Sequence, residues 1–199
     1  NHEEIIATLT RRKIAYRELA SPEKTVAGLI ASGNIVAHFF GRMEFGERAL
    51  GNRSILADPR DPEIKNRINS MIKYRESYRP FAPAVLAEKA HEYFEVKPEY
   101  SSRFMESVVP VKAEYRSSLP GITHVDGSGR LQTVKVEENG RFHRIIQEVE
   151  ALTGVAVVLN TSFNINGEPI VLSPDDALTT FFNSGLLYLV MGNVLVEKS

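Results

Sequence analysis

Apolar positions recur with helical spacing in four segments, and each segment starts or stops at a residue typical of helix boundaries. A serine or aspartate followed by proline opens three of them, at Ser21, Asp61 and Ser173. Glycines close three of them, at Gly33, Gly154 and Gly185. The sequence therefore predicts helices over 21–33, 61–72, 142–154 and 173–185, with weaker ones before Thr10 and over Ala87–Phe94.

Short runs of β-branched and aromatic residues lie between these helices and predict strands. The expected strands are Ile35–Phe40, Ala84–Leu86, Phe104–Val111, Thr133–Val136, Val155–Leu159, Leu186–Val190 and Val194–Glu197. The last two are joined near Gly192, which indicates a hairpin. Strands that alternate with helices indicate an α/β or α+β fold, in which helices flank a mixed sheet.

The segment Glu114–Gly129 has a different character, because Ser, Gly and Pro are frequent in it. Long loops of this kind in compact domains are often functional. We therefore expect a loop that acts as a lid, and the glycines before Arg130 suit a mobile arm that closes on an anion.

Composition narrows the class of protein. The 199 residues include 24 basic and 25 acidic side chains, so general binding to nucleic acid or to a membrane surface is not indicated. No cysteine is present, which excludes disulfides and thiolate chemistry. Without a secretion signal or a long apolar run, we expect a cytoplasmic, single-domain chain that does not enter a membrane.

One region is nevertheless rich in cations. Between Gly41 and Phe81, glycines are interleaved with basic residues, namely Arg42, Arg48, Arg53, Lys73, Arg75 and Arg79. Arginine offers a planar set of donors that matches phosphate or carboxylate oxygens, and glycine lets backbone N–H groups approach a ligand. This pattern favours a site for a phosphorylated small molecule. A surface loop whose arginines pair with neighbouring carboxylates remains the alternative.

A second candidate follows the apolar run Val155–Leu159, where the chain reads Asn160-Thr-Ser162-Phe-Asn164. Residues two apart in a strand share a face, so Asn160 and Ser162 are expected to point together. Ligands in α/β sheets tend to lie beyond the carboxyl ends of strands. Ser162 lacks the Gly-x-Ser-x-Gly setting of a hydrolase nucleophile.

No metal site is expected. His124 and Asp126 are only two candidate ligands, and the other histidines have no metal-binding spacing. His38 lies inside an apolar strand and is expected to be a core histidine.

Four motifs, in order, carry a resemblance to a known family: GRMEFGERALGNRSIL, KYRESYRPFAP, THVDGSGRLQTV and LNTSFNINGEPIV. Together they resemble the C-terminal domain of the O-carbamoyltransferases that modify antibiotics and nodulation factors. The resemblance extends from about Thr25 to Glu197. It implies a YrdC-like twisted mixed sheet flanked by helices, and it implies that the chain is the C-terminal part of a longer enzyme.

In that family this domain is similar to one that uses ATP and Mg²⁺ to convert carbamoyl phosphate into carbamoyl-adenylate. A separate N-terminal domain of the ASKHA type passes the carbamoyl group to a hydroxyl. The resemblance implies catalytic roles for Lys73, Arg79 and Ser162. Substrate binding is implied for those three together with Arg48, Arg130 and Asn160. A homodimer is one arrangement that the sequence leaves open.

The chain departs from the family at Glu47, where proline is usual. We therefore expect the loop to be looser, or the charge of Arg48 to be partly neutralised by the carboxylate. Two other functions remain as alternatives. One is an RNA-binding or nucleotide-binding module, which the near-neutral charge disfavours. The other is a non-catalytic scaffold that makes contacts through Phe39–Phe40 and Tyr93–Phe94.

Overall fold

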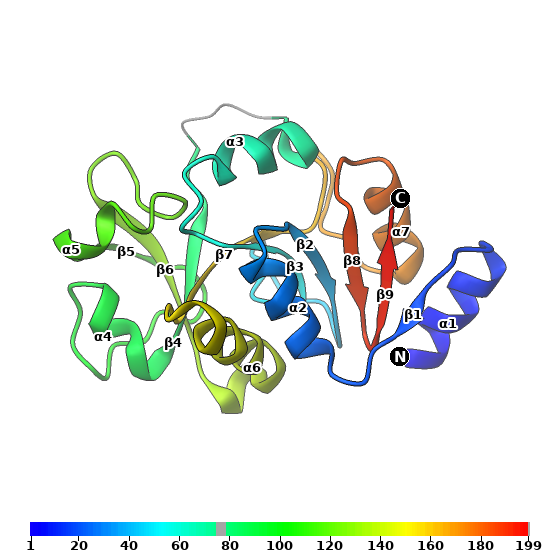
Figure 1. The fold of residues 1–199 in the computed structure, drawn as a ribbon, viewed down its shortest axis with the longest axis horizontal. Coiled ribbons are helices and arrows are strands. Elements are labelled where there is room, and N and C mark those ends of the chain that lie inside the picture. Colours follow the sequence, from blue (N-terminus) through cyan, green and yellow to red (C-terminus); the bar gives the residue numbers. More distant parts are fainter. Residues whose placement is uncertain (75–78, 199) are drawn as a thin grey trace.

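The fold is a twisted mixed sheet with helices packed around it, as the computed structural model of the chain shows (Figure 1). The structure describes residues 1–74 and 79–198. Within these ranges nine strands form one sheet in the order β1-β9-β8-β2-β3-β7-β4-β6-β5. The strands are β1 (Arg17–Glu18), β2 (Val36–Phe39), β3 (Arg53–Ala57), β4 (Ala82–Leu86), β5 (Ser107–Pro110), β6 (Ser128–Val134), β7 (Val157–Ser162), β8 (Tyr188–Met191) and β9 (Val194–Glu197).

Strands β2 and β8 run parallel, as do β4 and β6, and the other neighbours are antiparallel. The helices are α1 (His2–Arg11), α2 (Pro22–Ala31), α3 (Ile64–Ile68), α4 (Ala90–Tyr93), α5 (Ala113–Arg116), α6 (Val136–Thr153) and α7 (Pro174–Phe182). A π-helical turn, Asn69–Lys73, extends α3, and a 3₁₀ turn, Ala87–Lys89, precedes α4.

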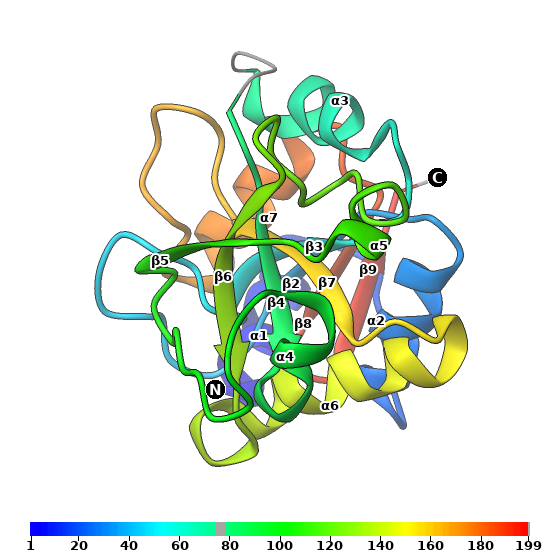
Figure 2. The same cartoon turned by 90° about the vertical axis from the view of Figure 1, so that its left-hand side faces the viewer.

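Helices α2 and α6 pack against each other over one part of the sheet, whereas α1 and α7 lie together near the edge formed by β1, β9 and β8 (Figures 1 and 2). The apolar stripes expected from the sequence face the core: Val26 and Ile30 of α2 and Ile145 and Ile146 of α6 have no exposed surface. One cluster of buried apolar side chains joins these helices to the strands. The predicted α/β class and mixed sheet are therefore confirmed.

The expected elements are present, but several boundaries differ. β3 was not expected, since its residues fell at the end of the predicted glycine–arginine loop. β6 begins at Ser128 rather than Thr133, and β5 covers only part of the predicted 104–111 strand. The short edge strand β1 also had no sequence signal, because both of its side chains are exposed.

The prediction of a lid over Glu114–Gly129 is wrong. Leu119 and Ile122 within this segment have no exposed surface. The Gly121 N–H donates to the Pro59 carbonyl oxygen at 2.8 Å. Arg130, expected on a mobile arm, lies within β6. Ser, Gly and Pro here serve turns of a packed connection, because two apolar residues are enough to anchor it to the core.

His38 on β2 is the core histidine that was expected. Its Nδ1–H donates to the Gly51 carbonyl oxygen at 2.6 Å. Burial, followed by the charge of Arg141, lowers its pKa from 6.5 to about 3, although the Gly51 contact opposes the shift. The folded protein thus holds this imidazole neutral at a pH where the unfolded chain would protonate it.

This difference predicts acid sensitivity between pH 6.5 and 3. Since the unfolded state binds the extra proton, stability is complete above pH 6.5 and falls as the pH decreases. At pH 5 the loss relative to pH 7 should be about 2 kcal/mol. Denaturant unfolding at the two pH values measures it, and His38→Gln, which cannot titrate, should remove this part of the pH dependence. An unchanged pH dependence in the variant would contradict the assignment.

Candidate functional site

The central strands bring the predicted site residues onto one face of the sheet. Asn160 of β7 pairs with Ala82 of β4, and Gln132 of β6 pairs with Ala84. Directly paired residues have side chains on the same face. Because alanine is small, the side chains of β7 and β6 meet across β4, where Asn160 Nδ2 donates to Gln132 Oε1 at 2.8 Å.

A small polar cleft of about 70 Å³ opens on this face. Its lining comes from the segment after β2, from the residues that lead into β4, from the segment before β5, from β6 and from the end of β7. The lining residues are Glu47, Arg48, Ala49, Pro80, Phe81, Ala82, Met105, Arg130, Asn160, Thr161 and Ser162. Four of the six predicted binding residues, Arg48, Arg130, Asn160 and Ser162, therefore lie together although they are far apart in sequence.

Two cations, Arg48 and Arg130, face this cleft. Arg130 is half-buried, and burial followed by the charge of Arg48 lowers the pKa of its guanidinium. Its Nε is buried without a hydrogen-bond partner. Within the described residues no ion pair engages Arg48 or Arg130, although the exposed Glu47 shares the cleft. Like charges held side by side with free donors are the setting that an anion stabilises.

Asn160 adds an unsatisfied acceptor to the same cleft. It is buried, and its Nδ2 donates to the carbonyl oxygen of Ala49 and to Gln132. Both partners are acceptors, so they fix the orientation of the amide. Its Oδ1 is buried without a partner. A ligand with an N–H group would satisfy this oxygen.

Lys73 lies behind the end of β7 rather than on the cleft wall. The π-helical turn carries this buried lysine to the turn after β7. Its Nζ donates to the Ser162 carbonyl oxygen at 2.6 Å and to the Asn164 carbonyl and side-chain oxygens at 3.0 and 2.8 Å. Lys73 thereby fixes the backbone that presents Ser162.

The Ser162 hydroxyl is held on both sides. It donates to Asn164 Oδ1 at 2.6 Å and lies 3.3 Å from Lys73 Nζ. An amide oxygen and an ammonium are not bases that would activate the hydroxyl as a nucleophile. This geometry suits a hydroxyl that orients a ligand through a hydrogen bond. The catalytic role of Ser162 stays a prediction.

Asn164 is the residue that sequence reasoning missed. It links Lys73, Ser162 and the Glu168 carbonyl oxygen. The available signal was its spacing, because a polar residue two positions after Ser162 continues the same face for as long as the chain stays extended.

Two other basic residues of Gly41–Phe81, Arg53 and Arg79, are not among the residues that line the cleft. Arg53 is buried, lies over the Phe39 ring and donates to the carbonyl oxygens of Phe40 and Gly41. Arg79 is exposed and directly precedes Pro80 of the cleft wall, but it is not among the lining residues, and its role stays a prediction. Arg75 lies outside the described residues.

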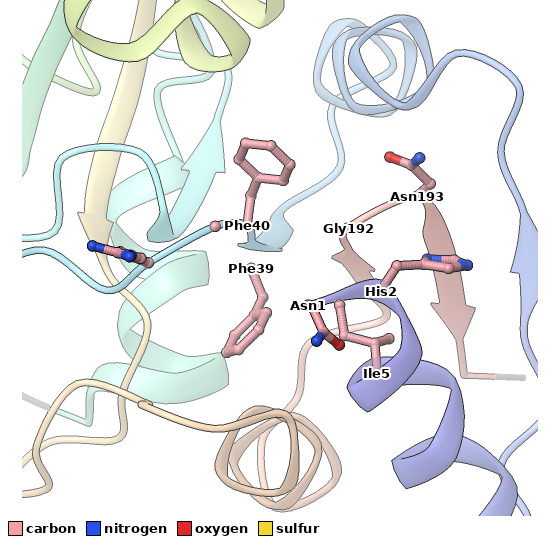
Figure 3. A pocket seen from close by; sticks show the side chains of 9 residues that line it. Asn1, His2, Ile5, Phe39, Phe40, Gly192 and Asn193 are labelled. Atoms are coloured by element: carbon pink, nitrogen blue, oxygen red, sulfur yellow. The ribbon is translucent and has the colours of Figure 1, made fainter.

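A larger cavity of about 430 Å³ lies elsewhere, between β2 and α1. Figure 3 shows the side chains of Phe39 and Phe40 on one side of it and those of His2 and Ile5 on the other. Arg42 lines it, but none of the predicted site residues does. Its lining is mainly apolar, so the smaller, polar cleft is the better candidate for an anion.

Neither a triad nor a metal centre is present in the part of the chain that the structure describes. His124 Nδ1 contacts Ser128 Oγ at 3.2 Å, and that hydroxyl donates to Asp126 Oδ1 at 2.6 Å. The serine lies between the other two residues, so the carboxylate does not orient the imidazole as a triad requires. Among the described residues, no group of three or more His, Asp or Glu side chains could hold a metal ion. No described helix is long and apolar enough to cross a membrane.

The structure thus combines a mixed α/β sheet with a cationic cleft beside the end of a central strand. The chain belongs to the family described as carbamoyltransferase C-terminus, which matches residues 27–198. It is 49% identical to nodulation protein NolO of Bradyrhizobium diazoefficiens, over 87% of this chain and 32% of that protein. It is 35% identical to the 3′-hydroxymethylcephem-O-carbamoyltransferase of Amycolatopsis lactamdurans, over 97% of this chain and 35% of that protein.

An uncharacterized protein of Synechocystis is 46% identical, over 87% of this chain and 31% of that protein. The chain thus spans about one third of the length of these relatives. Among solved structures, full-length HypF in a phosphate- and nucleotide-bound form has a TM-score of 0.57 at 19% identity, covering 92% of this chain and 22% of that chain. Sua5 of P. abyssi has a TM-score of 0.54 at 16% identity, covering 85% of this chain and 49% of that chain. These likenesses confirm the YrdC-like fold.

Proposed function

We propose that this domain activates carbamoyl phosphate with ATP and forms carbamoyl-adenylate for an O-carbamoyltransferase. One observation carries the proposal. Arg48 and Arg130 converge without an ion-pair partner among the described residues, opposite Asn160 and Ser162. Two cations, an N–H acceptor and a hydroxyl together match a molecule that bears both a phosphate and a carbamoyl group.

The reaction balances in two steps. Water cleaves the bond between the carbamoyl group and phosphate, which gives carbamate and inorganic phosphate. A carbamate oxygen then attacks the α-phosphorus of ATP, and the bond to the β-phosphate breaks, so pyrophosphate leaves with the displaced electron pair. Both steps bring anions together, so fixed cations contribute by neutralising charge and positioning the reactants.

Each cleft residue has a role that its contacts support. Arg48 and Arg130 bind phosphate oxygens through charge-assisted hydrogen bonds. Asn160 Oδ1 accepts from the carbamoyl amino group, which a simple phosphate lacks. Ser162 orients the ligand with its hydroxyl, and Lys73 holds the turn behind it.

Magnesium would enter with ATP. Mg²⁺ in such sites is bound mostly by substrate phosphates and water, with one or two carboxylates. The donor set agrees, since Glu47 is the carboxylate among the cleft lining and no metal cage exists in the described ranges. Bound there, Mg²⁺ would neutralise part of the triphosphate charge.

The transfer to a hydroxyl acceptor would take place elsewhere. The relatives are about three times as long as this chain. We propose that a separate domain of the ASKHA type receives the adenylate and holds the acceptor. The scaffold alternative loses three of its four proposed contact residues, because Phe39, Tyr93 and Phe94 are buried in the core, whereas Phe40 is half-buried and lines the larger cavity.

The proposal predicts that the chain forms pyrophosphate only when ATP, Mg²⁺ and carbamoyl phosphate are all present. Calorimetric titration should show binding of carbamoyl phosphate and of Mg–ATP, and a coupled assay should detect pyrophosphate. Omission of carbamoyl phosphate is the control and should abolish the signal. Pyrophosphate release without carbamoyl phosphate, or salt-sensitive RNA binding in place of ATP binding, would overturn the proposal.

A further inference from the structure

Gln132 of β6 is almost completely buried beside the cationic cleft, but it is not among the residues that line it. Its amide contacts the amide of Asn160, which does line the cleft. We propose that Gln132 is a positioning residue that makes the site specific for carbamoyl phosphate over acyl phosphates without an amino group. The inference rests on the function proposed above, because it concerns which of several similar phosphates that site accepts.

The sheet register brings the two amides together. β4 lies between β6 and β7, and its residues opposite Gln132 and Asn160 are Ala84 and Ala82. These alanines share a face of β4 and carry only a methyl group, so no larger side chain separates the amides. Both amide residues are at most 3% exposed. Away from water their hydrogen bond is strong, and an unpaired polar atom is costly.

Two adjacent carbonyl oxygens determine which way each amide faces. Gln132 Nε2 donates to the Leu50 carbonyl oxygen at 3.0 Å, and Asn160 Nδ2 donates to the Ala49 carbonyl oxygen at 3.1 Å. A carbonyl oxygen can only accept, so each amide must present its nitrogen to it. Gln132 therefore turns its oxygen toward Asn160 and accepts from Nδ2 at 2.8 Å.

This network leaves the Asn160 oxygen for the ligand. Oδ1 is buried without a hydrogen-bond partner among the described residues, whereas Nδ2 is occupied by two acceptors. A reversed Asn160 amide would place Oδ1 against both of those oxygens, and Gln132 supplies one of them. The other belongs to Ala49, which directly follows Arg48, so the same contacts tie the Asn160 acceptor to the segment that carries a phosphate-binding cation.

An acceptor in this fixed place distinguishes two phosphates that the arginines cannot tell apart. Carbamoyl phosphate and acetyl phosphate have nearly the same size and charge, and they differ in an amino group in place of a methyl group. The amino group can donate to Asn160 Oδ1, whereas the methyl group leaves this buried acceptor unpaired. A site built to form a hydrogen bond with its substrate rejects an analogue without the donor more strongly than size alone would.

Calorimetric titration of the chain with carbamoyl phosphate and with acetyl phosphate tests the inference. The wild type should bind carbamoyl phosphate roughly 10- to 100-fold more tightly, which is the effect of one buried hydrogen bond. Gln132→Met has a side chain of similar length that cannot form these hydrogen bonds. It should reduce the preference to about threefold or less while the affinity for acetyl phosphate stays unchanged.

Gln132→Glu is the matched control. Like Gln132→Met, it removes the donor to the Leu50 carbonyl oxygen, but its carboxylate still accepts from Asn160 Nδ2. It should therefore keep the preference for carbamoyl phosphate. The added charge would weaken the binding of both phosphates alike, so the ratio of the two affinities is the quantity to compare.

A double-mutant cycle shows whether Gln132 acts through Asn160. Asn160→Ala should abolish the preference, and adding Gln132→Met to it should change the ratio no further. A further change would mean that Gln132 contacts the ligand itself, which would overturn the positioning role. Thermal unfolding checks that each variant is folded, and Gln132→Ala replaces Gln132→Met if the latter is not.

The outcomes separate this inference from the proposed function. If the wild type does not bind carbamoyl phosphate, the proposed function fails and the inference fails with it. If the wild type binds both phosphates equally well, or if the folded Gln132→Met or Gln132→Ala variant keeps the full preference, the specificity role is wrong while the anion site stands. Loss of the preference in Gln132→Glu would assign the effect to the Leu50 contact and would also overturn it.

Discussion

Replacing Arg130 by alanine should reduce carbamoyl-phosphate-dependent pyrophosphate formation by roughly 100-fold or more without lowering the stability of the fold. The loss follows from removing a fixed charge where anions meet. Stability should stay level or rise, because burial and the charge of Arg48 both disfavour the charged guanidinium, as the lowered pKa of Arg130 indicates. A pyrophosphate assay and a thermal unfolding curve on the same preparation measure the two effects.

The matched control is Arg144→Ala on α6, which removes an exposed arginine paired with Glu148. It should leave both readouts unchanged. Arg48→Ala should resemble Arg130→Ala, because both guanidinium groups serve the same cleft. Normal pyrophosphate formation in Arg130→Ala would remove the anion-site assignment.

Lys73→Met should show the opposite pattern and lower stability together with activity. The lysine is buried, and its loss removes the hydrogen bonds that its ammonium donates to the carbonyl oxygens of Ser162 and Asn164. Hydrogen bonds from a charged donor contribute roughly 1.5–3 kcal/mol each, so about 3 kcal/mol of unfolding free energy should disappear at this half-buried turn. For a chain of this size Tm should fall by roughly 6–12 °C.

Lys97→Met serves as control, since Lys97 is exposed and should tolerate the change. Thermal unfolding of Lys73→Met decides between two roles for this lysine. A stable but inactive variant would mean that Lys73 contacts the substrate phosphates, as the family resemblance implies. A destabilised variant would mean that it supports the turn that carries Ser162 and Asn164.

The fold was predictable where one physical signal dominated. Caps and apolar stripes located α2, α6 and α7, and the hairpin between β8 and β9 followed from Gly192. β3 was missed because it directly follows a glycine–arginine segment that resembles a loop, and only tertiary pairing with β2 and β7 makes it a strand. The lid was predicted wrongly for a similar reason. The many turn residues of Glu114–Gly129 suggested a loop, whereas Leu119 and Ile122 anchor this segment in the core.

The sequence predicted most residues of the candidate site but not the separate role of each side chain. Motif order identified Arg48, Arg130, Asn160 and Ser162, which the fold brings together. Charge alone did not separate Arg53, which supports the backbone from within the core, from Arg48, which faces the cleft. That distinction depends on where β3 begins, because Arg53 is its first residue whereas Arg48 lies in the segment between β2 and β3.

The sheet order also decides how the protein can be handled in the laboratory. β9 lies four positions from β7, a separation of about 19 Å at ordinary strand spacing. Lys198, just after β9, donates to the Phe181 and Ser184 carbonyl oxygens at 2.6 Å and ties the chain to the end of α7. A biotinylated extension after Lys198 would attach the molecule to a sensor chip and leave its cleft accessible to solution. The dissociation rates of a series of compounds could then be measured on one surface.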